Sequence, residues 1–168
     1  TRKESSAASD VYKRQVFHLY REAEMSIDEI DELFNRRSGM KGLTGHNDMR
    51  EIWKLIEAGD EQAEMAMEIY LHRLLKYVGA YWALLGGLDA LTFTAGVGEN
   101  DPGVRWELCR SLAFMGVKID QELNEEHFTR EAIISTPDSA VKVLVVPTNE
   151  ELAIAQQVYS CLLYTSDA

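Results

Sequence analysis

A glycine-rich turn near the middle of the chain has the composition of a phosphate site. The turn, Gly96–Asn100 (GVGEN), directly follows Leu88–Ala95, which is predicted to be a strand buried on both faces. Asp101 and Pro102 then mark the start of a helix. Glycines between a strand and a helix let backbone amides approach an anion closely. The turn lacks the third glycine of a dinucleotide fingerprint and the lysine of a P-loop, so a plain strand-to-helix turn explains the same residues.

Two further groups of polar side chains stand where a ligand could bind. Asp48 and Arg50 begin a predicted helix, where the carboxylate could accept a ribose hydroxyl and the guanidinium could lie against a base or phosphate. A helix N-cap followed by a surface arginine explains this pair as well. Glu150 comes soon after the predicted strand Val141–Val146, at the edge where open α/β sheets bind ligands. Acids in a first helical turn also interact favourably with the helix dipole, which leaves a structural role open.

The histidines and cysteines indicate neither a zinc site nor a nucleophile. Cys109 lies within a predicted helix and Cys161 is remote from it, so the two form no disulfide framework, and a reducing cytoplasm fits best. No nucleophile elbow is present. The histidines lack metal-ligand spacing and are interpreted as solvated or packing residues: His18, His46, His72 and His127.

The first half of the chain is predicted to be helical. Ser26 and Glu29 form a capping box for a helix that ends near Asn35. Three glycines are expected to break any regular element over Arg36–Gly45. Asn47 or Asp48 caps a short helix that stops near residue 59, and a long packing helix runs from residue 61 to the glycine pair at 86–87.

The second half adds strands to the helices. Besides Leu88–Ala95, short strands are predicted over Val117–Ile119, Ile133–Ser135 and Val141–Val146, the last as an inner strand of a parallel sheet. A terminal helix opens at residue 148 or 149 and runs to Tyr159. Strands alternating with helices predict an α/β layer architecture with right-handed crossovers, in which helix exceeds strand.

Composition excludes several classes of partner. The chain has 168 residues, a formal charge of -11 and 46% hydrophobic residues, which is enough for one domain with a real core. The acidic balance argues against a nucleic-acid partner. No apolar run is long enough to predict a membrane helix, and no signal peptide is visible, so a cytoplasmic location without a membrane partner is expected.

The two ends do not continue the patterns beside them. SSAASDVYKRQ near the start and CLLYTSDA at the end resemble the translated transposon end that is used to prepare shotgun DNA libraries. We therefore expect residues 1–15 to be adaptor-derived and disordered, residues 16–160 to be the genuine domain, and residues 161–168 to be an adaptor-derived tail. Disordered native tails are the alternative. A chain cut at both ends is expected to be a fragment.

Three segments of the chain occur in the same order in acetate kinases. They read RRSGMKGLTGHNDMRE, DALTFTAGVGEND and IISTPDSAVKVLVVPTNEELAIA. The chain thus resembles the acetate kinase family over nearly all of residues 16–159. The resemblance implies a partial, helix-rich C-terminal domain of ribonuclease-H-like fold, from the superfamily that contains sugar kinases, Hsp70 and actin.

The resemblance also implies a reaction and the residues that serve it. The implied reaction is reversible transfer of the γ-phosphoryl group of ATP to acetate, giving ADP and acetyl phosphate, with Mg²⁺ as the metal. The acetate-binding and catalytic groups are implied to lie upstream of residue 16, so this fragment alone is expected to be inactive, and a homodimer is implied. The implied nucleotide contacts are Asp48, Met49, Arg50, Gly96, Val97, Gly98, Glu99 and Asn100, and the implied magnesium ligand is Glu150.

Two other interpretations remain open. A butyrate or propionate kinase of the same superfamily would share these segments, because the acceptor site is implied to lie elsewhere. A non-catalytic helical interaction module would instead use the apolar stripe of the long helix, from Met67 to Leu85.

Overall fold

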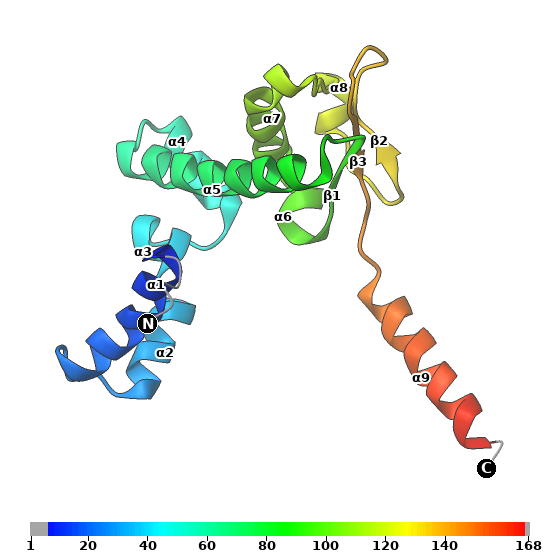
Figure 1. Cartoon of the computed structure of the whole chain (residues 1–168). Helices are drawn as coiled ribbons and strands as arrows, with labels where there is room; N and C mark the ends of the chain where they lie inside the picture. Colours follow the sequence, from blue (N-terminus) through cyan, green and yellow to red (C-terminus); the bar gives the residue numbers. More distant parts are fainter. Residues whose placement is uncertain (1–6, 167–168) are drawn as a thin grey trace. The chain divides into compact units, whose positions relative to one another are not determined.

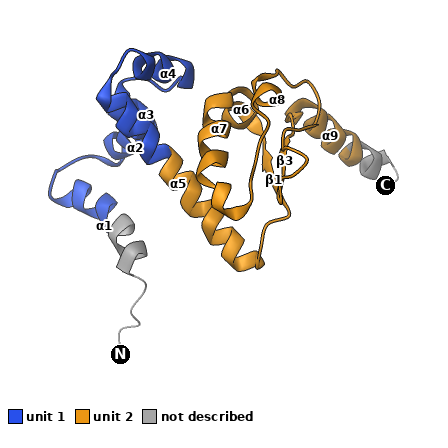
Figure 2. Cartoon of the chain, turned by 90° about the horizontal axis from the view of Figure 1, so that it is seen from above, with its two compact units in different colours: residues 1–70 blue, residues 71–168 orange. Residues whose placement is uncertain are grey.

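The computed structural model describes residues 7–166, with side chains described for residues 14–161. The chain divides into two compact units, residues 1–70 and 71–168 (Figure 2). The elements are labelled in Figure 1 and run, in chain order, as follows: α1 (Ala7–Arg21), α2 (Ile27–Arg36), α3 (Gly39–Thr44), α4 (Met49–Glu57), α5 (Glu61–Leu85), β1 (Ala90–Phe93), α6 (Ala95–Asn100), α7 (Pro102–Ser111), the 3₁₀ turn η1 (Ala113–Met115), α8 (Gln121–Glu125), β2 (Ala132–Ile133), β3 (Lys142–Val145) and α9 (Glu150–Ser166).

The first unit is helical, and local capping signals set its helix starts. The Ser26 hydroxyl accepts a hydrogen bond from the Glu29 amide at 3.3 Å, while the Glu29 carboxylate accepts from the Ser26 amide at 2.8 Å. This confirms the predicted capping box of α2. The carboxylate of Asp48 caps α4 by accepting a hydrogen bond from the Arg50 amide. The unit buries Ile52 from α4, and Ala63, Ala66 and Met67 from the first turns of α5.

Residues 36–45 contain a helix that the sequence does not predict. The expectation that glycines break any regular element there is wrong, because α3 occupies Gly39–Thr44. Gly39 and Gly45 lie at its two ends with φ of +63° and +78°, where the left-handed conformation lets the chain enter and leave the helix. Inside the helix, a Cβ on Gly42 would lie 2.6 Å from the Arg37 carbonyl oxygen. These glycines permit a short, tight helix instead of preventing it.

Helix α5 spans residues 61–85, as predicted, and ends before the glycine pair. Residues 71–85 belong to the second unit, where Leu71, Leu74, Leu75 and Val78 pack against its hydrophobic core. The predicted packing stripe is correct only in part, since Tyr77, Tyr81 and Leu85 are exposed.

The second unit is built on a three-stranded mixed sheet with the order β1-β3-β2. Strand β3 is the inner strand, as predicted, and pairs in parallel with β1 from Ala90↔Lys142 to Phe93↔Val145. Its other edge pairs with β2, which is antiparallel, so the sheet is not purely parallel. The predicted strands at 117–119 and 133–135 reduce to the two residues of β2 and one bridge between Ile119 and Ser135.

Strand β1 is not buried on both faces. Only Phe93 is buried, Leu91 is half-buried, and Ala90 and Thr92 are exposed. This alternation is typical of a strand that packs on one face only, and β1 also lies at the edge of the sheet. The apolar run LDALTFTA is therefore explained by one buried face rather than two.

The core of the second unit joins the sheet to α7 and to the segment after it. Arg105 and Asn124 are also buried, within the same unit. The apolar members of the core are Phe93, Leu108, Cys109, Leu112, Val117, Ile134, Val141, Val143 and Val145.

Helices extend into both ends of the chain. Helix α1 begins at Ala7, so residues 7–15 are helical where the sequence analysis expects disorder. The stretch contains alanine, lysine, arginine and glutamine, which favour helices. Helix α9 runs on to Ser166, beyond the predicted domain end at residue 160. Residues 1–6 and 167–168 lie outside the described residues, and the adaptor origin of the ends stays a prediction.

Among the helices of the described residues, none combines the length and apolarity that crossing a bilayer requires.

The two cysteines differ in exposure, which predicts different reactivities. Cys109 is buried in the core, and desolvation raises the pKa of its thiol to about 12, whereas Cys161 is exposed on α9. Since the thiolate is the reactive form, we expect Cys161 to be modified rapidly by a disulfide reagent and Cys109 only after unfolding. Counting the thiols that react in native buffer and in urea checks this. Rapid modification of both thiols in native buffer would contradict the burial of Cys109.

Candidate functional site

The predicted phosphate turn lies where the carboxyl ends of the parallel strands β1 and β3 meet. The Val146 amide donates to the Phe93 carbonyl at 2.8 Å, which extends the pairing to the last residue of β1. Residues 95–100 then form the six-residue helix α6 rather than the open loop predicted from the sequence. Ala95 has a φ of +59°, so the chain turns sharply at the junction of strand and helix. A non-glycine residue in this conformation is strained.

The two glycines of this turn have different surroundings. A Cβ on Gly98 would lie 3.3 Å from the backbone carbonyl carbon of Phe93 and 3.5 Å from its Cα and Cβ. A Cβ on Gly96 would meet nothing within 4 Å. Gly98 therefore allows α6 to pack directly on the end of β1, while Gly96 borders open space.

Glu99 ties the turn to the chain that leaves β3. Its carboxylate accepts hydrogen bonds from the amide and the hydroxyl of Thr148, each at 2.7 Å. The Thr148 hydroxyl also lies 2.9 Å from the Thr94 hydroxyl and accepts from the Ala95 amide at 3.1 Å. These contacts join the ends of both parallel strands, and the bonds from Thr148 hold the pKa of Glu99 below its usual range.

Thr148 contacts the predicted phosphate turn, and the sequence analysis does not identify this contact. The sequence predicts it, or Asn149, as the cap of the last helix. In the structure Asn149 fills that role, because its side-chain oxygen accepts from the Leu152 amide at 2.9 Å, and Thr148 turns to Glu99. No local pattern signals a contact between residues 49 positions apart.

The remaining residues of the turn are arranged around its backbone. The Asn100 side chain donates to the Gly96 carbonyl at 2.9 Å and so closes the turn on itself. Val97 is half-buried. Because the side chains of Glu99 and Asn100 bind within the protein, a ligand at this turn would meet the backbone beside Gly96 more readily than those two side chains.

Glu150 is the first residue of α9 and is exposed, two positions after Thr148. In the described part of the chain, no group of three or more histidine, cysteine or acidic side chains could enclose a metal ion. Magnesium commonly keeps several waters and uses one or two carboxylates together with the phosphates of its substrate. The exposed carboxylate of Glu150, close in the chain to Thr148, which contacts the predicted phosphate turn, would fit that type of binding.

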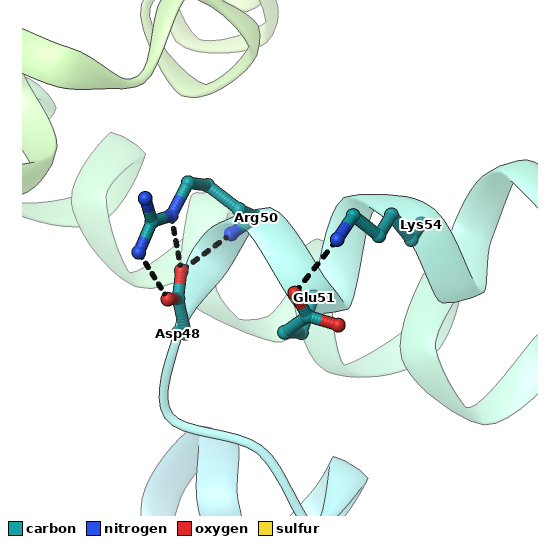
Figure 3. A network of polar contacts seen from close by, with 4 residues as sticks. All are labelled: Asp48, Arg50, Glu51 and Lys54. Carbon is teal, nitrogen blue, oxygen red and sulfur yellow. Dashed lines mark hydrogen bonds and ion pairs between the residues drawn. The ribbon is translucent and has the colours of Figure 1, made fainter.

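The other predicted segment, Asp48–Arg50, belongs to the first unit and is described within it (Figure 3). Arg50 donates from Nε and Nη2 to the Asp48 carboxylate at 3.0 and 2.6 Å, and its amide donates to the same carboxylate at 3.0 Å. These bonds lower the pKa of Asp48 to about 2. Glu51 and Lys54 pair beside them at 2.8 Å.

This pairing leaves part of both groups available. Arg50 donates three hydrogen bonds to the Asp48 carboxylate, whose side chain is still 40% exposed. The Arg50 side chain is largely exposed and has donors beyond the two that bind Asp48. Met49 is half-buried at the start of α4. The segment can therefore offer a partly exposed carboxylate and several donors to a polar ligand, besides capping its helix.

The link between Glu99 and Thr148 predicts a measurable dependence of stability on pH. The pKa of Glu99 in the folded chain lies below its unfolded value of about 4.3. Its contribution to folding stability is therefore fully present above about pH 4.3 and is lost as the pH falls through the folded pKa. We expect the melting temperature to fall less steeply on acidification in Glu99→Gln than in the unchanged chain.

Glu126→Gln, a change at an exposed glutamate after α8, is the matched control and is expected to leave the acid profile unchanged. Thermal melting of the three proteins between neutral and acid pH tests the link. Identical profiles for Glu99→Gln and the unchanged chain would show that the contact contributes nothing.

Comparison with known proteins identifies the family. The model of the acetokinase family matches residues 6–156. The chain belongs to the acetokinase family. The acetate kinase of Leifsonia xyli subsp. xyli is 54% identical over 150 residues, which cover 89% of this chain and 38% of that protein. The crystal structure of Porphyromonas gingivalis acetate kinase superposes with a TM-score of 0.76 at 42% identity, covering 88% of this chain and 37% of that one.

A second solved structure that is similar to this chain is named a propionate kinase. A propionate kinase from Francisella tularensis subsp. tularensis matches with a TM-score of 0.72 and 37% identity, over 90% of this chain and 37% of that one. The chain thus spans a little over a third of the length of the relatives it matches. The helix-rich chain with its small mixed sheet agrees with a fragment of the actin-like ATPase fold, as predicted.

Proposed function

We propose that this chain is the nucleotide-binding part of an acetate kinase, which transfers the γ-phosphoryl group of ATP to acetate and reverses the reaction with acetyl phosphate and ADP. Membership of the acetokinase family over residues 6–156 carries this proposal. Relatives whose sequences are 54% and 52% identical to this chain are named acetate kinases, which supports acetate as the phosphoryl acceptor. The proposed enzyme is a phosphotransferase that acts on a carboxyl group, is cytoplasmic, and functions as a homodimer.

In this proposal the turn Gly96–Asn100 binds the phosphates of ATP or ADP. Its position at the carboxyl ends of β1 and β3 is the place where open α/β sheets bind ligands. The open space beside Gly96 supports a close approach of a ligand to the backbone. The Glu99–Thr148 contacts fix the turn before the ligand arrives, which lowers the entropy that binding would otherwise cost.

The proposed adenosine contacts are Asp48, Met49 and Arg50. The partly exposed carboxylate of Asp48 suits a ribose hydroxyl, and the planar, exposed guanidinium of Arg50 suits stacking on a base or binding a phosphate. Met49 offers a polarizable apolar surface beside them.

Glu150 is the proposed ligand of Mg²⁺. The ion would neutralise charge on the nucleotide phosphates, which the acidic chain needs because its own charge is -11. Glu150 would bind it through one carboxylate, with phosphate and water oxygens completing the coordination.

The acceptor is the part of the proposal with a specific rival. The similarity to a propionate kinase structure favours a second candidate, a kinase that acts on propionate or butyrate. Since the groups that bind the acid are proposed to lie outside this chain, the chain alone is expected to bind nucleotide but to transfer no phosphoryl group. A module that only binds other proteins through its helices would bind neither ATP nor ADP.

Calorimetry and a chimaeric enzyme test these possibilities together. MgADP is titrated into the purified 168-residue chain, and we expect binding that weakens when Glu150 is replaced by glutamine. A chimaera in which this chain replaces the matching segment of the Leifsonia xyli acetate kinase is expected to phosphorylate acetate, because the chain would supply a working nucleotide site. The acceptor is decided by the full-length enzyme that contains this chain, assayed with acetate, propionate and butyrate, and we expect acetate to react fastest. Absence of MgADP binding or an inactive chimaera would contradict the proposed site, and a preference of the full-length enzyme for propionate or butyrate would favour the rival acceptor.

A further inference from the structure

Arg105 is a charged residue inside the second unit. It lies on α7, one turn after the Asp101 cap, and only 1% of its surface is exposed. Lysine and arginine are almost never fully buried unless they are paired, so a buried guanidinium needs partners that repay its desolvation. Desolvation also lowers the pKa of Arg105 from its usual value.

The partners of Arg105 are the last carbonyl groups of the proposed phosphate turn. Its Nη1 donates to the Gly98 carbonyl at 3.0 Å and to the Glu99 carbonyl at 2.8 Å. These carbonyls belong to the last turn of α6, where backbone acceptors have no partner within the helix. The guanidinium therefore fastens the end of the turn to α7, and its positive charge lies at the end of α6 that favours a cation.

The other side of the guanidinium is bound by Asn124 at the end of α8. Nε of Arg105 donates to the Asn124 side-chain oxygen at 2.9 Å, and Nη2 donates to the Asn124 backbone carbonyl. Asn124 is itself fully buried, and its side-chain Nδ2 donates to the Pro102 carbonyl at 3.0 Å. The Phe128 ring lies 5.7 Å from the guanidinium carbon, which adds a cation–π contact.

These contacts form one connected network from α6 through α7 to α8. All four acceptors are neutral oxygen atoms, and they surround the fixed fork of the guanidinium from two sides. A lysine could carry the charge but could not reach the same set of acceptors. The shape of the guanidinium, in addition to its charge, is what the site uses.

We propose that Arg105 is a positioning residue for nucleotide binding, which holds the backbone of Gly96–Asn100 in its binding conformation by binding the Gly98 and Glu99 carbonyls. Arg105 does not touch the nucleotide in this proposal. It acts from behind the turn, while Glu99 and Thr148 fasten the turn to β3. The inference rests on the proposed nucleotide site at Gly96–Asn100.

Hydrogen exchange and MgADP titration of the 168-residue chain test this role. We expect Arg105→Lys to speed exchange of the amides at 96–101 about tenfold and to weaken MgADP binding by a similar factor, since about 1.4 kcal/mol corresponds to tenfold. Exchange in β3 is expected to stay unchanged, which separates loss of positioning from general loss of stability. Arg110→Lys is the matched control, because Arg110 lies on the same helix but pairs with Glu107 at the surface.

Two further variants keep the test decisive if Arg105→Lys does not fold. Asn124→Ala leaves Arg105 in place but removes one of its acceptors, and a smaller increase in exchange at 96–101 is expected. In Arg105→Gly, added guanidinium at low millimolar concentration should restore MgADP binding, whereas sodium chloride at equal ionic strength should not.

The outcomes separate this inference from the proposed function. Unchanged exchange at 96–101 in both Arg105→Lys and Asn124→Ala would overturn the positioning role. Failure of the unchanged chain to bind MgADP would overturn the nucleotide site, while the exchange data would still decide whether Arg105 holds the turn.

Discussion

Replacing Gly98 with valine is expected to lower the free energy of unfolding of the second unit by about 1–3 kcal/mol, as overpacking does. Even a single added Cβ would lie 3.3 Å from the Phe93 backbone, and the two methyl groups of valine would extend further toward β1. To relieve the contact, α6 must move away from the strand. Because that movement would displace the backbone of the proposed phosphate turn, MgADP binding is expected to weaken at least about tenfold, or 1.4 kcal/mol.

Gly96→Val is the matched comparison for that change. A Cβ at this position would meet no atom within 4 Å, so stability is expected to stay close to that of the unchanged chain. Its bulk would instead fill the open space that the phosphates are proposed to occupy, so that MgADP binding falls without unfolding. Urea denaturation and calorimetric titration of both variants distinguish the effects. Tighter MgADP binding by Gly98→Val would argue against a phosphate site at this turn.

Leu112→Ala is expected to have the largest effect on stability, about 2–5 kcal/mol, which is typical of large-to-small changes in a core. Leu112 is fully buried between α7 and the sheet, where it belongs to the cluster with Val143 and Val145. Removal of its branched end would leave a cavity that these neighbours fill only in part. Loss of this much stability can unfold a small domain under ordinary conditions.

Phe114→Ala serves as the control for Leu112→Ala. Phe114 lies two residues further along and is 82% exposed, so its truncation is expected to change stability by less than about 0.5 kcal/mol. Urea unfolding followed by far-ultraviolet circular dichroism, with hydrogen exchange at β3 amides, measures both variants. Equal effects of the two changes would contradict the position of Leu112 in the core.

The sequence is most informative where a local interaction sets the structure. The caps at Ser26, Asp48 and Asp101 were all predictable, because each uses a side chain within a few residues of the amide it binds. The long helix α5 was predictable from apolar spacing, and the inner position of β3 from its continuous apolar run.

Predictions fail where the outcome depends on distant residues or on glycine in an unexpected setting. The helices α3 and α6 contain glycines that propensity counts against a helix, but the ends of α3 use left-handed conformations and Gly98 fits against Phe93. The burial of β1 depends on which face of the sheet is covered by other elements, and this cannot be predicted from the residues of the strand alone.

In the candidate site, too, local features were predictable from the sequence and contacts between distant residues were not. The resemblance to acetate kinases pointed to Gly96–Asn100, which the structure locates at the sheet edge as expected for a ligand. Thr148 and Arg105 could not be found in this way, because one is 49 residues from Glu99 and the other reads as an ordinary helix arginine. Neither residue type nor spacing distinguishes a buried, networked arginine from an exposed one such as Arg110.

The parallel pairing of β1 with β3 also has a consequence for the order of events during protein synthesis. Residue 90 pairs with residue 142. Strand β1 is therefore synthesised before its partner and stays unpaired until the intervening segment has been made. At about 5–20 residues per second, that wait lasts several seconds. The Glu99–Thr148 contact needs a still later residue. The proposed nucleotide site is therefore among the last parts of this unit to form, and the nascent chain must complete β3 before it could bind the proposed nucleotide.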